Sequence, residues 1–359
     1  MAHNTGWADG PGDRIECATR LRGAAEAAGG LGVVGDTGLE PVTSCMSSMR
    51  ANQLRQSPSA GEDSTNGWRA RVRPACDDVP MLDLELIDCG AGRRLERFGR
   101  VLVDRTAPAA TEPVRLPASE WARPDLRWAK GAWVRGAAAD PWQVRAEGLT
   151  LECRPAAGGQ VGVFPEHAGT WAWLARAVGA ATDRLGRPPE VLSLFGYTGG
   201  ASLACARAGA RVTHVDASKP AVAWARRNAE LSGLAESPIR WIVEDARAFV
   251  RRERRRGRHY DGVVLDPPSY GHGTGAWRID EDLPPLLEDL AALVGPRPAL
   301  ALLSAHTPGY DRERLGALLR EHLGVPAMGE VLVIRARSGA VLPLGAWAHG
   351  PDRPPGPRR

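Results

Sequence analysis

Residues 191–202 read VLSLFGYTGGAS and residues 261–271 read DGVVLDPPSYG. Each stretch is a short apolar run that ends in a turn, which is typical of a buried strand. Between them the sequence alternates in type: ASLACARAG, RVTHVD, KPAVAWARRNAELSG, IRWIVED and ARAFVRRERRR. Strands that alternate with amphipathic helices predict a parallel sheet with helices on both faces.

The same alternation extends to both sides of this segment. A helix is expected at LPPLLEDLAALV and a strand at ALALLSA, and GEVLVIRARS and AVLPLGAWAH are expected to form a hairpin that adds one antiparallel strand. We therefore expect an α/β domain over residues 166–349. Residues 81–165 contain Gly-separated strand patterns and predict a small strand-rich α+β domain.

Residues 1–80 show no sustained period and are rich in Gly, Ser and Ala. They are interpreted as a disordered or miscalled N-terminal extension, with the natural protein beginning near Met81. Residues 350–359, GPDRPPGPRR, are too rich in Pro to fold, and a disordered tail is expected.

The composition is that of an ordinary globular protein, with 43% hydrophobic and 25% charged residues. No long apolar run or secretory signal is present, so no membrane association and a cytoplasmic location are expected. The six cysteines are scattered without a C-x-x-C pair. This pattern argues against a structural zinc site, and no metal is expected.

Arginine supplies nearly all the positive charge of a chain whose net charge is +4, and seven arginines lie within residues 246–260. Arginine clusters attract phosphate groups, which favours a nucleic-acid partner. A solvated helix that keeps the protein soluble explains the cluster equally well. The pattern leaves both interpretations open.

Three strand ends carry residues suited to a nucleoside cofactor. Gly196 and Gly199 let the backbone approach a ligand, and Asp216, 20 residues after Gly196, is placed to accept hydrogen bonds from ribose hydroxyls. Asp245 is placed to accept from an adenine amino group, with the N–H of Ala246 beside it. The dinucleotide pattern G-x-G-x-x-G fails at Thr198, which favours S-adenosylmethionine over a nicotinamide cofactor.

The turn after the next strand is Asp266-Pro267-Pro268. Two prolines fix the backbone and remove two N–H donors, so the turn presents a carboxylate and carbonyls without competing donors. Such a surface can hold an exocyclic amine against a methyl donor, and Tyr270 is placed to stack on a flat substrate. We expect these four residues to be catalytic.

These motifs resemble those of class I S-adenosylmethionine-dependent methyltransferases. The segments GVFPEHAGTW, LFGYTGGASLA, THVDASKPAVAWARRNAELSGL, RWIVEDARAFV and DGVVLDPPSYG are most similar, in that order, to the bacterial large-subunit ribosomal RNA methyltransferases that act on cytosine C5 or guanine N7. The resemblance implies a Rossmann-like domain with a mostly parallel seven-stranded sheet and one antiparallel strand. The expected cofactor pocket comprises Phe164, Glu166, Phe195, Gly196, Tyr197, Thr198, Gly199, Asp216, Ala217, Ser218, Asp245, Ala246 and Asp266.

Two departures from that group shape the prediction. Residues 1–80 hold no counterpart of its N-terminal RNA-binding domain. Ser304, Ala305 and His306 stand where a C5 mechanism would need a cysteine nucleophile. We therefore predict methylation of RNA, with ribosomal RNA as the expected substrate, at a base nitrogen, with His272 and His306 as candidate bases. A methyltransferase for a protein or small molecule, and a non-catalytic RNA-associated factor that binds the cofactor, are the alternatives.

Overall fold

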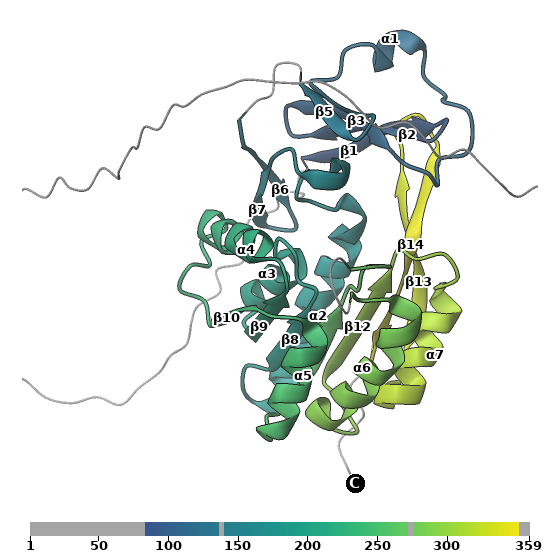
Figure 1. The fold of residues 1–359 in the computed structure, drawn as a ribbon. Coiled ribbons are helices and arrows are strands. Elements are labelled where there is room, and N and C mark those ends of the chain that lie inside the picture. Colours follow the sequence, from purple (N-terminus) through teal and green to yellow (C-terminus); the bar gives the residue numbers. More distant parts are fainter. Residues whose placement is uncertain (1–82, 136–139, 272–275, 352–359) are drawn as a thin grey trace, which may run out of the picture. The chain divides into compact units, whose positions relative to one another are not determined.

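The computed structural model describes residues 83–135, 140–271 and 276–351 (Figure 1). They fall within one compact unit, Arg73–Arg359. The expectations for residues 1–80, for His272 and for residues 352–359 lie outside the described residues. In the described ranges no helix combines the length and apolarity needed to cross a bilayer.

The main sheet has seven strands in the order β10-β9-β8-β11-β12-β14-β13. All neighbouring strands from β10 to β12 pair in parallel, and β14 is antiparallel to both β12 and β13. The expected mostly parallel sheet with one antiparallel strand is confirmed. The strands are β8 (Glu190–Leu194), β9 (Arg211–Asp216), β10 (Ile239–Val243), β11 (Gly262–Leu265), β12 (Leu300–Ala305), β13 (Met328–Arg335) and β14 (Val341–Gly350).

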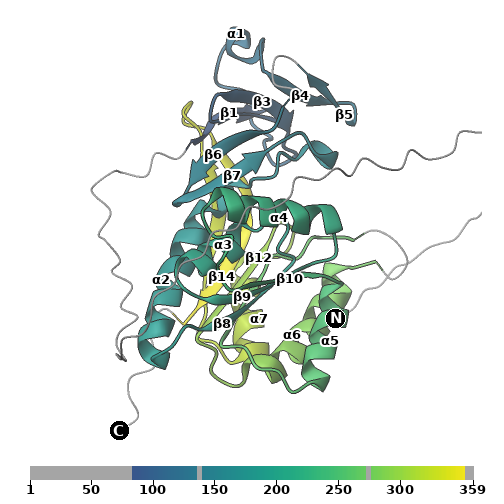
Figure 2. The same ribbon diagram turned by 90° about the vertical axis from the view of Figure 1, so that its left-hand side faces the viewer.

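Helices cover both faces of this sheet (Figures 1 and 2). Alternate residues of each strand point to opposite faces, so Leu194 and Val263 pack in the core under α5, α6 and α7, whereas Val191 and Val264 pack in the core under α2 and α3. The helices are α2 (Ala168–Leu185), α3 (Gly200–Arg207), α4 (Lys219–Leu231), α5 (Ala246–Arg255), α6 (Ile279–Val294) and α7 (Arg312–Leu323).

A second, five-stranded sheet with the order β1-β2-β3-β4-β5 precedes the main sheet in the chain. A separate hairpin, β6–β7, lies beside α4 (Figure 2), where the N–H of Glu152 donates to Oδ1 of Asn228 over 2.8 Å. The elements are β1 (Leu84–Gly90), β2 (Arg93–Phe98), β3 (Val101–Thr106), α1 (Ala118–Trp121), β4 (Leu126–Ala129), β5 (Ala132–Arg135), β6 (Trp142–Ala146), β7 (Leu149–Cys153), η1 (Ala157–Gly159) and η2 (Pro165–His167).

The tip of the β13–β14 hairpin joins the two sheets (Figure 1). The N–H of Arg337 donates to the carbonyl of Leu86 over 2.8 Å, and the N–H of Ser338 donates to that of Ile87 over 3.1 Å. The Ser338 hydroxyl donates to the buried carboxylate of Asp88 over 2.6 Å. Burial alone would raise the pKa of Asp88, but its hydrogen bonds from Ser338 and neighbouring groups outweigh burial and lower it.

Candidate cofactor and active site

A cleft of about 1860 Å³ lies at the carboxyl ends of the central strands and is also bordered by Arg94 and Pro108 from the strand-rich part of the chain. This is the edge at which ligands bind in doubly wound sheets. Twelve of the residues predicted for the site line this cleft: Phe164, Glu166, Phe195, Tyr197, Asp216, Ala217, Ser218, Asp245, Ala246, Asp266, Pro267 and Pro268.

The glycine turn after β8 lies beneath the cleft. Gly196 and Thr198 border a smaller adjoining cavity of about 60 Å³, and Gly199 borders neither space. The Thr198 hydroxyl donates to the carbonyl of Gly162 over 2.6 Å. Gly199 has a φ of 94° at the N-terminus of α3, a conformation that glycine adopts without strain. None of these three residues lines the main cleft itself, so their part in cofactor binding stays a prediction.

Asp216 organises the turn that follows β8. Its Oδ2 accepts the N–H of Tyr197 over 2.8 Å, and its Oδ1 accepts the N–H of Ser218 over 2.8 Å. Burial raises the pKa of Asp216, although both hydrogen bonds act in the opposite direction. Phe195 and Tyr197 have positive φ values of 57° and 45°, which are rare for non-glycine residues and cluster at functional sites.

Asp245 caps the N-terminus of α5, where its Oδ1 accepts the N–H of Ala248 over 3.1 Å. Arg247 donates to both carboxylate oxygens, over 3.3 Å and 3.2 Å, and also to Asp282 over 2.7 Å. Burial alone would raise the pKa of Asp245, but the hydrogen bonds from Arg247 and Ala248 outweigh it and lower the pKa. The carboxylate is thus held as an anion at the rim of the cleft.

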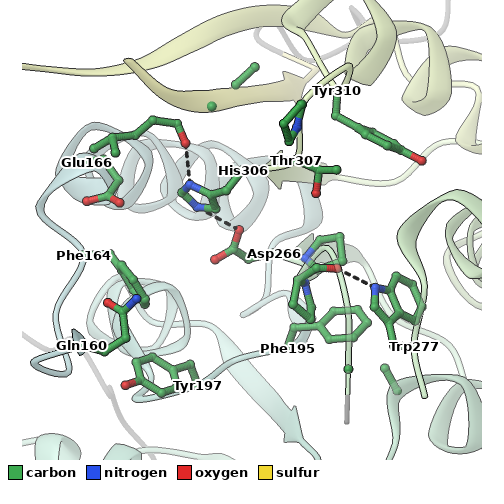
Figure 3. A pocket seen from close by; sticks show the side chains of 18 of the residues that line it. Gln160, Phe164, Glu166, Phe195, Tyr197, Asp266, Trp277, His306, Thr307 and Tyr310 are labelled. Carbon is green, nitrogen blue, oxygen red and sulfur yellow. Dashed lines mark hydrogen bonds and ion pairs between the residues drawn. The ribbon is translucent and has the colours of Figure 1, made fainter. Parts of the chain in front are cut away.

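Asp266 lies close to two histidines, of which Figure 3 shows His306. Its Oδ1 accepts the Ser304 hydroxyl over 2.6 Å and lies 3.7 Å from Nε2 of His306, while its Oδ2 lies 3.5 Å from Nε2 of His167. Burial would raise the pKa of Asp266, but the two histidines and Ser304 together lower it. Asp266 is therefore an anion fixed in orientation.

The proline turn is braced by an aromatic residue. The carbonyl of Pro268 accepts the indole N–H of Trp277 over 2.7 Å, and the Trp277 ring lies 4.8 Å from that of Phe195 (Figure 3). Pro267 is buried. The side chain of Tyr270 is 70% exposed and does not line the cleft, so its role in stacking stays a prediction.

Sequence reasoning missed Arg94, which lines the cleft opposite the main sheet. Arg94 and Glu166 are only 7% and 9% exposed, yet Nε and Nη1 of Arg94 and Oε2 of Glu166 have no hydrogen-bond partner among the described residues. Nε of Arg94 does lie 3.4 Å from a carboxylate oxygen of Glu96. Buried polar atoms without partners are costly, and a ligand commonly satisfies them. Together they suit a ligand that carries both a carboxylate and an ammonium group.

None of the cysteines in the described ranges lines the cleft. Cys205 is fully buried within α3, and burial raises its pKa to about 12. At neutral pH such a thiol holds almost no thiolate, which is the nucleophilic form. The site therefore offers carboxylates and imidazoles, but no described thiolate.

The arginines of α5 are matched by carboxylates. Arg252 pairs with Glu244 at 2.6 Å, and Arg254 pairs with Asp289 of α6. Arg256 and Arg258 lie 3.4 Å and 3.8 Å from the buried Glu253. These pairs offset much of the positive charge that the sequence suggested for phosphate binding.

The fold and the acidic strand ends around one cleft define a Rossmann-like methyltransferase. The chain belongs to the S-adenosylmethionine-dependent methyltransferases, because its sequence is 37% identical to that of the SAM-dependent methyltransferase from Agrobacterium tumefaciens, whose crystal structure is known. That similarity has a TM-score of 0.69 and covers 74% of this chain and 89% of that one. A family model described as conserved hypothetical protein 95 matches residues 173–282.

Two curated relatives are named for ribosomal RNA. The chain is 30% identical over 178 residues to ribosomal RNA large subunit methyltransferase I of Pseudoalteromonas translucida. The matched segment covers 48% of this chain and 44% of that protein. It is 32% identical over 139 residues to ribosomal RNA large subunit methyltransferase K/L of Methylococcus capsulatus, covering 38% of this chain and 18% of that protein. The chain thus spans less than half the length of these relatives.

Proposed function

We propose that this protein transfers a methyl group from S-adenosylmethionine to a base nitrogen of RNA, with ribosomal RNA as the first candidate. The observation that carries the proposal is the convergence of Asp216, Asp245 and Asp266 on one cleft that also holds the unsatisfied atoms of Arg94 and Glu166. These acceptors, together with the Arg94 donor, complement the groups of an adenosyl amino acid.

Each part of the cofactor has a candidate partner. Asp216 would accept hydrogen bonds from the ribose hydroxyls, and Asp245 and Ala246 would meet the adenine edge. Arg94 would bind the methionine carboxylate, and Glu166 would bind the ammonium group. When bound, S-adenosylmethionine supplies a methyl group on a sulfonium that is already an activated leaving group.

The acceptor side of the cleft favours a nitrogen atom. Methylation of cytosine C5 needs a cysteine thiolate that adds to the ring, and none of the described cysteines reaches the cleft. A nitrogen with a lone pair needs only to be oriented and relieved of its proton. The Asp266 carboxylate is fixed by Ser304 and is placed to accept a hydrogen bond from an attacking amine.

The RNA substrate is supported by the relatives named for ribosomal RNA and by the net charge of +4. The α5 arginines support it less than their number suggests, because acidic partners offset them. Because these arginines are paired with carboxylates, a protein or small-molecule substrate remains the alternative.

Label transfer from tritiated S-adenosylmethionine to total RNA, total protein and a metabolite extract tests the proposal. We expect label in RNA with the unaltered protein and none with Asp266→Ala. Nucleoside mass spectrometry of the labelled RNA should then show an N-methylated base. Label confined to protein or metabolites, or 5-methylcytosine as the product, would contradict the proposal, and cofactor binding without any transfer would indicate a non-catalytic factor.

A further inference from the structure

Three ligand-type atoms from distant parts of the sequence converge at the back of the cleft. Nε2 of His167 lies 3.2 Å from Nε2 of His306, and the carboxylate of Asp266 lies 3.5 Å and 3.7 Å from these two nitrogens. His167 comes from η2, Asp266 follows β11, and His306 follows β12. Parallel strand ends and the turn before α2 thus bring them together.

The outer nitrogens of both rings fix which tautomer is present. Nδ1 of His306 lies 2.6 Å from the carbonyl of Leu344, which can only accept, so this nitrogen carries a hydrogen. Nδ1 of His167 lies 3.3 Å from Oγ1 of Thr170. The Thr170 hydroxyl already donates its hydrogen to the carbonyl of His167 over 2.8 Å, so Oγ1 accepts from Nδ1.

When both rings are neutral, the two Nε2 atoms present lone pairs toward each other and toward a carboxylate. Electron-rich atoms facing one another at these distances repel unless a proton on one ring or a metal cation lies among them. A histidine whose other ring nitrogen donates to a carbonyl or hydroxyl oxygen is the usual arrangement of a metal-binding histidine.

The separations between the two histidine nitrogens and the oxygens of the Asp266 carboxylate are compatible with a tetrahedral ion. Zinc–nitrogen and zinc–oxygen bonds of about 2.0–2.2 Å place neighbouring ligand atoms about 3.4 Å apart in a tetrahedron. Octahedral coordination at similar bond lengths would place them about 3 Å apart. The Nε2–Nε2 separation of 3.2 Å lies midway between these two values. The separations of 3.5 Å from His167 to Oδ2 of Asp266 and of 3.7 Å from His306 to Oδ1 lie nearer to the tetrahedral value.

We propose that His167, Asp266 and His306 form a three-ligand site for a divalent transition metal ion of the zinc type, with its fourth position open to the cleft. Ser304 orients the carboxylate from behind, and the side chains of Asp266 and His306 are 34% and 35% exposed toward the cleft that they line. The open position would hold a water molecule or an oxygen of a cleft ligand, the arrangement of catalytic rather than structural zinc sites.

This site differs from the sequence-based expectation of no metal, which rested on cysteine spacing and did not consider histidines far apart in the chain. The proposal does not depend on methyl transfer. A metal-binding measurement therefore tests it separately from the proposed function.

The test is zinc binding by the full chain after removal of metals with a chelator and dialysis. Isothermal titration with ZnCl2 should give one site per chain, and His167→Gln and His306→Gln should each weaken binding at least tenfold. His259→Gln, which changes an exposed histidine beyond α5, is the matched control and should bind as the unaltered protein does. Cobalt titrated in place of zinc should give the intense visible absorption of a tetrahedral site.

A further variant, which changes neither histidine, tests the site in case the histidine variants misfold. Thr170→Val removes the oxygen that accepts from His167 while keeping the side-chain volume, and it should weaken zinc binding about tenfold. Absence of a zinc site in the unaltered protein would overturn the proposal. Equal zinc binding by all four variants would overturn it as well, because the metal would then be adventitious.

Discussion

The imidazole of His214 occupies the space into which a side chain at Gly196 would project. A Cβ added to Gly196 would lie 2.5 Å from Nδ1 of His214, far inside van der Waals contact. His214 cannot easily retreat, because it is fully buried and its Nδ1 lies 2.9 Å from the Ser202 hydroxyl. The glycine in this turn is thus required by the core beneath it as well as by any ligand above it.

Gly196→Ala is therefore expected to destabilise the fold by about 1–3 kcal/mol, the usual range for overpacking. Urea unfolding measures this loss. Adding His214→Ala to that variant should recover part of the stability, giving a coupling between the two positions. Gly179→Ala in α2, where an added Cβ meets nothing within 4 Å, should be neutral or stabilising. Strict additivity of the two changes would show that the contact is unimportant.

Stability is expected to fall in mild acid because of His214. Burial lowers its pKa from 6.5 to about 3, so the native protein keeps it neutral while the unfolded chain takes up a proton below pH 6.5. The stabilisation is thus complete above pH 6.5 and is lost progressively as the pH falls toward 3. Between pH 7 and pH 5 the loss should be about 2 kcal/mol.

Urea unfolding of the unaltered protein and of His214→Gln at these two pH values isolates that contribution. The variant should lose less stability in acid than the unaltered protein, whereas His259→Gln should behave like the unaltered protein. Parallel pH profiles for all three proteins would assign the acid sensitivity to other groups.

Asp216→Ala is expected to abolish binding of S-adenosylmethionine in calorimetry. The ribose would lose its acceptor, and the N–H groups of Tyr197 and Ser218 would lose the carboxylate that orients the turn. Asp261→Ala is the matched control, because Asp261 precedes β11 at the opposite end of the strand and pairs with Arg187 at 2.7 Å. Unchanged cofactor affinity in Asp216→Ala would mean that the cofactor binds elsewhere.

Glu166→Gln and Arg94→Met should each weaken cofactor binding, and Glu166→Gln should do so with little loss of stability. Hydrogen bonds to charged groups contribute about 1.5–3 kcal/mol, which corresponds to about 10-fold or more in affinity. Because Oε2 of Glu166 lacks a hydrogen-bond partner among the described residues, Glu166→Gln should leave thermal unfolding nearly unchanged. Arg94→Met also removes the positive charge that lies 3.4 Å from the buried Glu96, so it should lower the melting temperature as well. A large drop in melting temperature with unaltered affinity would instead identify the pair as structural.

The positions of the strands along the chain and the acidic residues at their ends were predictable because both are local signals. An apolar run followed by Gly196 or Asp266 has the same meaning wherever it occurs in a parallel sheet. Arg94 and His167 were not predictable in this way, because long-range packing brings β2 and η2 to the cleft. The sequence left the role of the α5 arginines open for the same reason, since the partner of Arg254 lies on α6 and cannot be recognised from the arginine run itself.

The hydrogen bonds between the β13–β14 tip and β1 have a mechanical consequence. The β13–β14 hairpin completes the main sheet and also forms hydrogen bonds with the strand-rich part. It therefore couples the wall of the cleft formed by the main sheet to the wall formed by the strand-rich part. We therefore expect the width of the cleft opening to change little when a ligand binds, so that the opening itself limits which substrates enter.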